Sequence, residues 1–162
     1  MLLAVRALFW TLALPGVFGF YLPWTLFDLG SVEINASSPR HLLGLVSIGA
    51  GTWLLLACIW EFARRGRGTL SPVDPPKHLV ISGLYRFVRN PMYLSVTTIV
   101  LGELLLTMSR GLLVYWVMWF AAVNLFVMGY EEPTLREQFG ADYERYTRAV
   151  GRWLPRLSPY HP

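Results

Sequence analysis

The sequence predicts an all-α integral membrane protein with about four transmembrane helices and an amphipathic cytoplasmic helix at its C-terminal end. Of its 162 residues, 54% are hydrophobic and only 15% are charged, whereas a soluble domain carries about 25% charged residues. The apolar residues fall into long windows, and a helix needs roughly 20 such residues to cross a bilayer. Arginine and lysine gather on one side of these windows. We therefore treat residues 1–162 as a single membrane domain.

Four apolar windows give the expected spans, at residues 2–22, 42–62, 91–108 and 112–130. The first window is longer than the apolar core of a signal peptide and has no small-residue cleavage site, so we expect a retained helix. It should bend near Pro15 and Gly16. Small residues of the second span predict close packing against another helix, namely Gly44, Ser47, Gly49 and Gly51.

The basic residues predict the orientation. Twelve of the 14 lie at the start of the first span, between the second and third, or after the fourth, which leaves only Arg40 and Arg110 on the other side. The positive-inside rule then places both termini, the loop 63–90 and the tail 131–162 in the cytoplasm, and we expect a bacterial inner membrane. Attraction to anionic lipids accounts for the net charge of +4, so no nucleic-acid partner is expected. The lone Cys58 has no pairing partner, and no metal site is expected.

The loop and the tail differ in pattern. Glycine and proline in the loop favour an irregular connection. Beyond Pro133 the apolar residues recur every three or four positions, which predicts an amphipathic helix against the bilayer or the bundle. These residues are Leu135, Phe139, Tyr143, Tyr146 and Val150.

Most of the clustered ionisable side chains lie in two polar segments, GLYRFVRNPMYL at residues 83–94 and EEPTLREQFGADYERY at residues 131–146. Each has a structural interpretation. Asn90 and Pro91 can begin a helix as N-cap and first residue, and Glu131 and Glu132 suit the positive end of the tail helix. Together the segments and the adjoining Tyr130 place three tyrosines, three arginines or amides and two adjacent carboxylates at one membrane depth. This set suits a small zwitterion that also bears a cation, and S-adenosylmethionine has the matching groups.

The two segments, separated by paired apolar spans and followed by the pattern EE..L...FG..Y..Y...V.RW.P, resemble the isoprenylcysteine carboxyl methyltransferase and phospholipid methyltransferase family of integral-membrane enzymes. The resemblance covers about residues 66–155. It implies a helical S-adenosylmethionine site at the cytoplasmic face, open to lipid between the helices. By position it implies the cofactor-binding residues Gly83, Tyr85, Arg89, Asn90, Pro91, Tyr93, Leu94, Glu131 and Glu132, of which Arg89, Glu131 and Glu132 are the catalytic candidates. Family members often have histidine at the position of Asn90, and asparagine can bind there but cannot titrate.

Several acceptors of the methyl group are compatible with the sequence. Eukaryotic prenylcysteine enzymes resemble this chain but carry an arginine just ahead of the acidic pair, whereas here no Arg or Lys lies between Gly111 and Leu135. An isoprenylcysteine-like carboxylate, a phospholipid amine or another small lipophilic nucleophile therefore fits, with Arg136 and Tyr130 as candidate substrate residues. A carboxylate or thiolate needs no general base. An ammonium group would need one, and the acidic pair is nearest.

Two other functions are compatible with the pattern, namely an NADPH-dependent membrane reductase of the steroid-reductase type and a non-catalytic membrane assembly or lipid-binding protein. The expected partners are membrane lipids and a lipophilic or lipidated substrate.

Two polar residues lie inside spans. Glu103 is expected toward the outer side of the membrane. It could be a functional carboxylate, or a structural residue that is either protonated or paired with Arg110. Asn124 is expected to form an interhelical hydrogen bond.

Overall fold

The computed structural model describes residues 13–65 and 79–161, and within these ranges every regular element is helical. The α-helices are α2 (Leu22–Leu26), α3 (Pro39–Arg65), α4 (Pro91–Thr107), α5 (Arg110–Phe126) and α6 (Glu132–Ala149). Two π turns, η1 (Val17–Tyr21) and η4 (Val127–Glu131), precede α2 and α6, and short 3-10 turns form η2 (Leu29–Ser31) and η3 (Gly83–Arg86).

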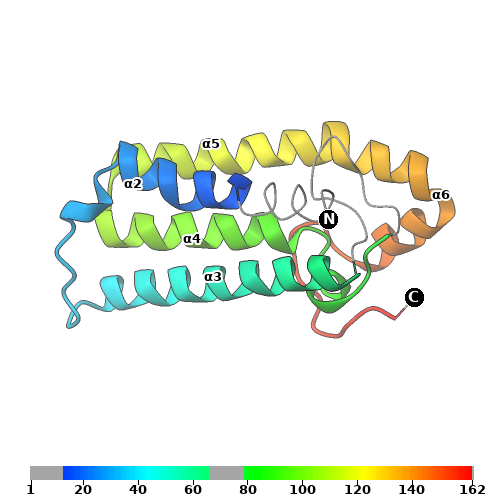
Figure 1. The fold of residues 1–162 in the computed structure, drawn as a ribbon, viewed down its shortest axis with the longest axis horizontal. Helices are drawn as coiled ribbons and strands as arrows, with labels where there is room; N and C mark the ends of the chain where they lie inside the picture. Colours follow the sequence, from blue (N-terminus) through cyan, green and yellow to red (C-terminus); the bar gives the residue numbers. More distant parts are fainter. Residues whose placement is uncertain (1–12, 66–78, 162) are drawn as a thin grey trace.

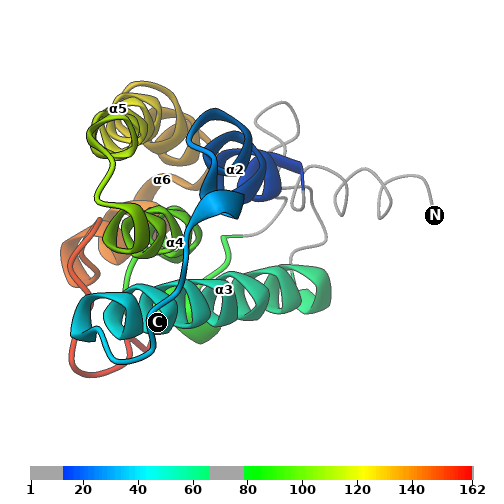
Figure 2. The same ribbon diagram turned by 90° about the vertical axis from the view of Figure 1, so that its left-hand side faces the viewer.

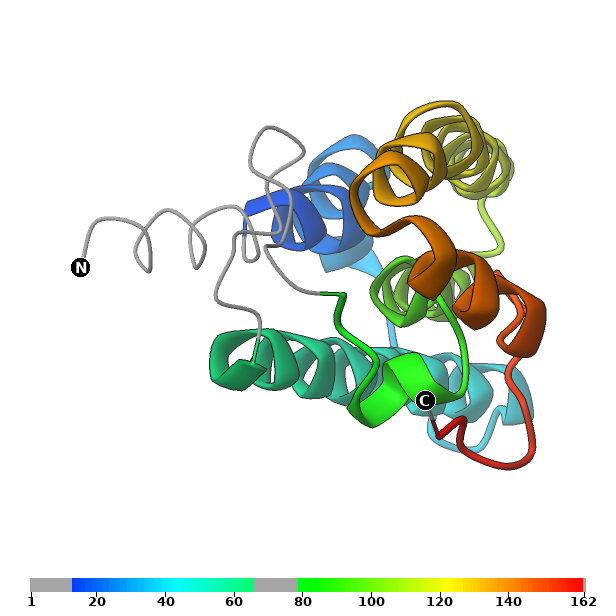
Figure 3. The same cartoon turned by 90° about the vertical axis from the view of Figure 1, so that its right-hand side faces the viewer.

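The long helices run along the long axis of the molecule (Figure 1). Helix α4 is central, with α3 on one side and both α5 and the η1–α2 segment on the other, as the end-on view in Figure 2 shows. Its buried residues Val96 and Val100 form a core with Leu112 of α5. Helix α6 extends α5 past the end of the bundle and then bends back toward the beginning of α4 (Figure 3). The bundle thus brings the end of α3, the beginning of α4 and the α5–α6 junction together at one end.

Membrane crossing is supported for two of the four predicted spans. Among the described residues, Pro39–Glu61 and the continuous helix Arg110–Ala149 are long and apolar enough to cross a bilayer, and the apolar part of the latter ends at Tyr130. The third span corresponds to α4, which is apolar but only 17 residues long. Much of the first predicted span lies in residues 1–12, outside the described ranges. Its described part passes through Pro15 and Gly16 and widens directly afterwards into the π turn η1, a known cause of helix bending.

Helices α3 and α4 approach closely because glycines face each other. A Cβ at Gly44 would lie 2.9 Å from the carbonyl oxygen of Gly102, and one at Gly51 would lie 2.8 Å from that of Ser95. The predicted packing role is therefore confirmed for Gly44 and Gly51. It is wrong for Gly49, where an added Cβ meets nothing within 4 Å.

Gly102 and Gly49 give a matched test of this packing. A Cβ at Gly102 would lie 2.6 Å from the carbonyl oxygen of Gly44, a contact that only a backbone shift can relieve. We expect Gly102→Ala to lower the free energy of unfolding by about 1–3 kcal/mol. Gly49→Ala should be neutral or stabilise by up to about 1 kcal/mol, because it reduces the freedom of the unfolded chain. Equal unfolding midpoints for the two variants in detergent would contradict the close approach.

Glu103 is buried in α4, and its Oε2 has no hydrogen-bond partner among the described residues. The alternative of an ion pair with Arg110 is wrong, since no such pair forms between these two described side chains. Glu103 does not belong to the end of the bundle where the polar segments meet, because it follows the first residue of α4 by about 18 Å of helix.

Candidate active site

The two polar segments meet where α4 begins and α5 passes into α6, beside the end of α3 (Figures 1 and 3). A third segment joins them there, the chain that follows α6. Its backbone pairs with the first polar segment, because Arg89 N donates to Gly151 O, Arg156 N to Phe87 O and Tyr160 N to Arg86 O, each at 2.9 Å. Sequence reasoning did not assign these tail residues to the site.

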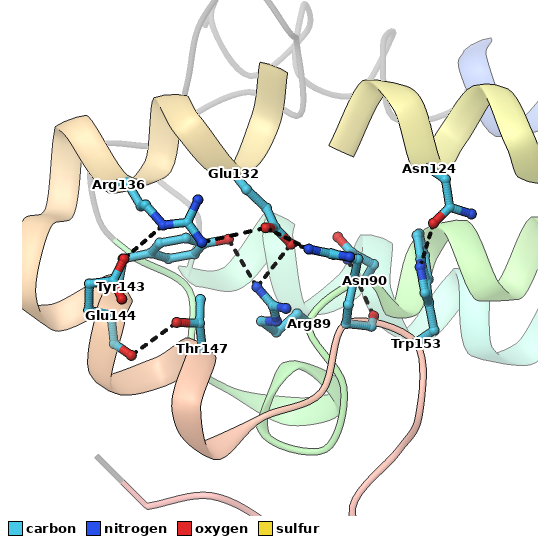
Figure 4. Close-up of polar contacts among 10 residues, drawn as sticks. Arg89, Asn90, Asn124, Glu132, Arg136, Tyr143, Glu144, Thr147 and Trp153 are labelled. Atoms are coloured by element: carbon cyan, nitrogen blue, oxygen red, sulfur yellow. Dashed lines mark hydrogen bonds and ion pairs between the residues drawn. The ribbon is translucent and has the colours of Figure 1, made fainter. Parts of the chain in front are cut away.

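Glu132 is the centre of the charged network (Figure 4). Its buried carboxylate accepts from Arg152 Nε at 2.6 Å and Nη2 at 2.9 Å, and it pairs with Arg89 Nη1 at 3.0 Å and Arg136 Nη2 at 3.7 Å. Burial alone would raise the pKa of Glu132. The hydrogen bonds from Arg152 and the three guanidinium charges outweigh burial, so the pKa is lowered and the carboxylate is ionised.

Glu131 occupies a different environment from its neighbour. Its Oε2 accepts a hydrogen bond of 3.0 Å from the hydroxyl of Tyr93 on α4. Burial and the charge of Glu132 raise the pKa of Glu131, and the Tyr93 hydrogen bond only partly offsets them. Two adjacent carboxylates whose environments move their pKa values in opposite directions are typical of sites that divide charge binding from proton transfer.

The π turn η4 precedes the acidic pair and sets the direction of its side chains. It ends at Glu131, and the backbone N–H of Glu132 bonds to the carbonyl of Val127, five residues earlier. A π turn adds a residue to the helix and so rotates the next turn relative to the preceding face, and such turns often occur at functional sites. Glu131 faces α4, and Glu132 faces the arginines and the tail.

The beginning of α4 is where the sequence predicted it. Pro91 is its first residue and Asn90 is the N-cap, but the Asn90 side chain makes no capping hydrogen bond. Its Nδ2 instead donates to the carbonyl oxygen of Arg152 at 3.3 Å. The predicted capping role of this side chain is therefore wrong, and Asn90 holds the tail against α4.

Gly83 brings the first segment against α3. Its φ of +53° suits glycine, and a Cβ there would lie 3.2 Å from the carboxyl carbon of Glu61. Tyr85, two residues later, is held by its carbonyl oxygen, which accepts from the Tyr146 hydroxyl at 2.6 Å. Glu61 is thus a third carboxylate at this end of the bundle. It was not predicted, although it is an acidic residue near the end of an apolar span, on the side where the polar segments lie.

The remaining predicted residues lie at the margin of this network. Leu94 is half-buried in the first turn of α4. Arg136 is about half exposed and binds Glu144 at 2.7 Å as well as Glu132. Tyr130 is exposed, with its ring beside Phe126. The network itself therefore consists of Arg89, Glu132, Arg152 and, at its edge, Arg136.

The helix α6 that carries Glu132 is interrupted. Gly140 has non-helical angles with φ of 49°, so the predicted helix beyond Pro133 is present in two pieces. The five apolar residues predicted to share a face all belong to one cluster, in which Tyr143, Tyr146 and Val150 are buried and Leu135 and Phe139 pack against them. This cluster also contains Ile81 and Tyr160, so α6 supports both the first polar segment and the tail.

Two polar atoms near the network are buried and have no hydrogen-bond partner among the described residues, namely Ser82 Oγ and Arg89 Nε. Buried polar groups without partners are uncommon in folded proteins. Both belong to the first polar segment, and both can donate to an anionic group. They indicate where a ligand would complete the hydrogen bonding.

A family model for phospholipid methyltransferases matches residues 39–142, which is more than half of the chain. The chain belongs to this family. The matched region begins with α3 and includes both the start of α4 and the acidic pair, so the predicted resemblance is confirmed. Membership indicates a membrane methyltransferase and does not favour the reductase alternative. Searches of curated proteins and of solved structures found no match.

Proposed function

We propose that this protein transfers a methyl group from S-adenosylmethionine to an acceptor that partitions into the membrane, as isoprenylcysteine carboxyl methyltransferase-like enzymes do. One observation carries the proposal. The part of the chain matched by the methyltransferase family contains the segment with the unpartnered buried donors and the acidic pair, which lie at one end of an apolar bundle. Both termini and this end of the bundle would face the cytoplasm of a bacterial inner membrane, where the basic residues gather.

The residues present suit this cofactor. Arg89 Nε and Ser82 Oγ would donate to its carboxylate. Glu131 accepts from Tyr93 at Oε2, and its carboxylate would also accept from an amino group or a ribose hydroxyl of the cofactor. The predicted positions Gly83, Tyr85, Asn90, Pro91 and Leu94 would line the same site. When bound, the cofactor supplies an electrophilic methyl group that a nucleophile takes by in-line displacement.

The two carboxylates would then have different roles. Glu132 holds the guanidinium of Arg89 at 3.0 Å, so it orients a cofactor-binding group and is unsuited to take up a proton. Glu131 is the candidate base if the acceptor is an ammonium, because its raised pKa favours proton uptake. A carboxylate or thiolate acceptor would leave Glu131 to bind the cofactor. In each case catalysis rests on positioning and exclusion of water.

A lipophilic acceptor fits the surroundings of the site. Large apolar side chains are exposed along α3 and α5, including Trp53, Trp60, Val117 and Met118, as expected of faces in contact with lipid. An acceptor could enter sideways from the bilayer and reach the site already desolvated. Tyr130 and Arg136 lie exposed where such an acceptor would arrive, and we propose them as its contacts.

Binding of S-adenosylhomocysteine to the purified full-length protein tests the cofactor. We expect wild-type protein in detergent to bind it in a calorimeter and to show no binding of NADPH. Replacing Glu131 and Glu132 together with alanine should weaken binding by roughly 2 kcal/mol or more, because charged hydrogen bonds are lost. A folded wild-type protein that binds NADPH but not S-adenosylhomocysteine would refute the proposal.

A further inference from the structure

Three consecutive residues of the tail each bind a different part of the site. The carbonyl of Gly151 accepts from Arg89 N at 2.9 Å. The side chain of Arg152 forms the two hydrogen bonds to Glu132, at 2.6 and 2.9 Å. The indole Nε1 of Trp153 donates to Oδ1 of Asn124 at 2.8 Å. The tail therefore joins the beginning of α4, the beginning of α6 and the body of α5.

Hydrogen bonds on both sides of its amide group fix the side chain of Asn124. It lies in α5 about two helical turns before Glu132. Its Nδ2 donates to the carbonyl of Phe120 at 2.9 Å, which leaves Oδ1 directed at Trp153, whose ring packs 5.3 Å from that of Phe120. The partner of this polar residue is therefore the tail and not another span, contrary to the expectation from sequence.

We infer that Asn124 and Trp153 are positioning residues, which fix Arg152 on Glu132 and thereby the guanidinium of Arg89. The inference rests on the proposed function, in which Arg89 binds the cofactor. Arg89 and Arg152 share Oε1 of Glu132, at 3.0 and 2.6 Å. A tail that shifts at residue 153 therefore changes the position of the carboxylate that orients Arg89. Trp153 thus acts through Arg152 and Glu132, without contacting the cofactor or the acceptor itself.

Trp153→Phe tests the inference, because phenylalanine keeps one aromatic ring but lacks the five-membered ring of the indole and its N–H. The control below loses the same atoms, so the comparison isolates the position of the lost hydrogen bond. Asn124→Leu removes the acceptor. We expect each variant to weaken S-adenosylhomocysteine binding about fivefold to tenfold, the usual worth of one hydrogen bond. The double variant should bind no more weakly than the weaker single variant, because both remove the same interaction.

Trp116→Phe is the matched control. Trp116 also lies on α5, and its Nε1 donates to the carbonyl of Thr97 at 3.0 Å, away from the tail. This variant loses an equivalent hydrogen bond, so its unfolding temperature should fall similarly. Its affinity for S-adenosylhomocysteine should stay within about twofold of wild type, because no contact of the network changes. Equal losses of affinity in Trp116→Phe and Trp153→Phe would overturn the inference.

A second measurement separates this inference from the proposed function. The side-chain NMR signal of Arg89 Nε, assigned with Arg89→Lys in isotope-labelled protein, should shift in Trp153→Phe and remain unchanged in Trp116→Phe, without any cofactor present. Wild-type protein that fails to bind S-adenosylhomocysteine would refute the proposed function, while this signal still decides the role of Trp153. An unchanged Arg89 signal in Trp153→Phe would refute the inference even if the cofactor binds.

Discussion

Replacing Glu132 with alanine is expected to lower the free energy of unfolding by about 3–5 kcal/mol, the range found when one partner of a buried ion pair is removed. Its carboxylate side chain is only 5% exposed and is the shared counter-charge of Arg89, Arg152 and Arg136. Without it, Arg89 keeps a charge in a site where its own side chain is 11% exposed. Denaturant or thermal unfolding of the detergent-solubilised protein measures the loss.

Glu144→Ala is the control for this prediction. Glu144 pairs with Arg136 at 2.7 Å, but the two side chains are 44% and 47% exposed. An exposed pair contributes about 0–1 kcal/mol because solvent screens it. If Glu144→Ala and Glu132→Ala destabilised the protein equally, burial of the network would have no energetic consequence and its role in fixing Arg89 would be wrong.

The same carboxylate gives a pH dependence of stability. The pKa of Glu132 is lower in the folded protein than its ordinary value of 4.5. The unfolded state therefore binds the proton more readily, and the stabilisation is complete above the unfolded-state pKa. It is lost as the pH falls through the lowered folded-state value. Glu132→Gln, which cannot ionise, should lack this component of acid unfolding.

The sequence predicted that the two polar segments meet, because this follows from the orientation of the spans and from the position of each segment at a span end. Positive residues on one side of the spans and a polar segment at each of two span ends place Asn90 and Glu131 at the same membrane face. Small residues likewise predicted close packing for α3. They did not distinguish Gly44 and Gly51 from Gly49, because the face of a helix that meets its neighbour depends on the whole bundle.

Other features of the site depend on tertiary structure. Glu131 and Glu132 are adjacent in sequence, but one carboxylate binds Tyr93 and the other the arginines, and this depends on the helices and the tail that pack on either side of the α5–α6 junction. The partner of Asn124 is 29 residues away, in a tail whose glycine, prolines and arginines gave no periodic pattern. Glu61 belongs to the site because the folded chain places Gly83 against its side chain, and these two residues are far apart in the sequence.

Methyl groups supplied by labelled S-adenosylmethionine are expected to appear in the organic-soluble fraction of native membranes that contain this protein. If the acceptor is an ammonium, Glu131→Ala should reduce the transfer by at least about a hundredfold, the scale of a lost general base. Arg89→Ala should abolish the transfer, because the group that binds the cofactor carboxylate is lost. Glu137→Ala, which changes an exposed residue of α6, should retain wild-type transfer. Label confined to a water-soluble thiol or amine would contradict a membrane-partitioning acceptor while leaving methyl transfer intact.

The pH profile of kcat/KM tests the role of Glu131 in this reaction. With an ammonium acceptor, transfer should rise with pH as Glu131 loses its proton, with a midpoint above 4.5 because burial raises its pKa. Tyr93→Phe removes the hydrogen bond that lowers this pKa, so the rising limb should move to higher pH. Glu131→Gln should lack the limb, because glutamine cannot titrate. A rising limb that remains in Glu131→Gln would assign the titration to another group and would refute the role of Glu131 as the base.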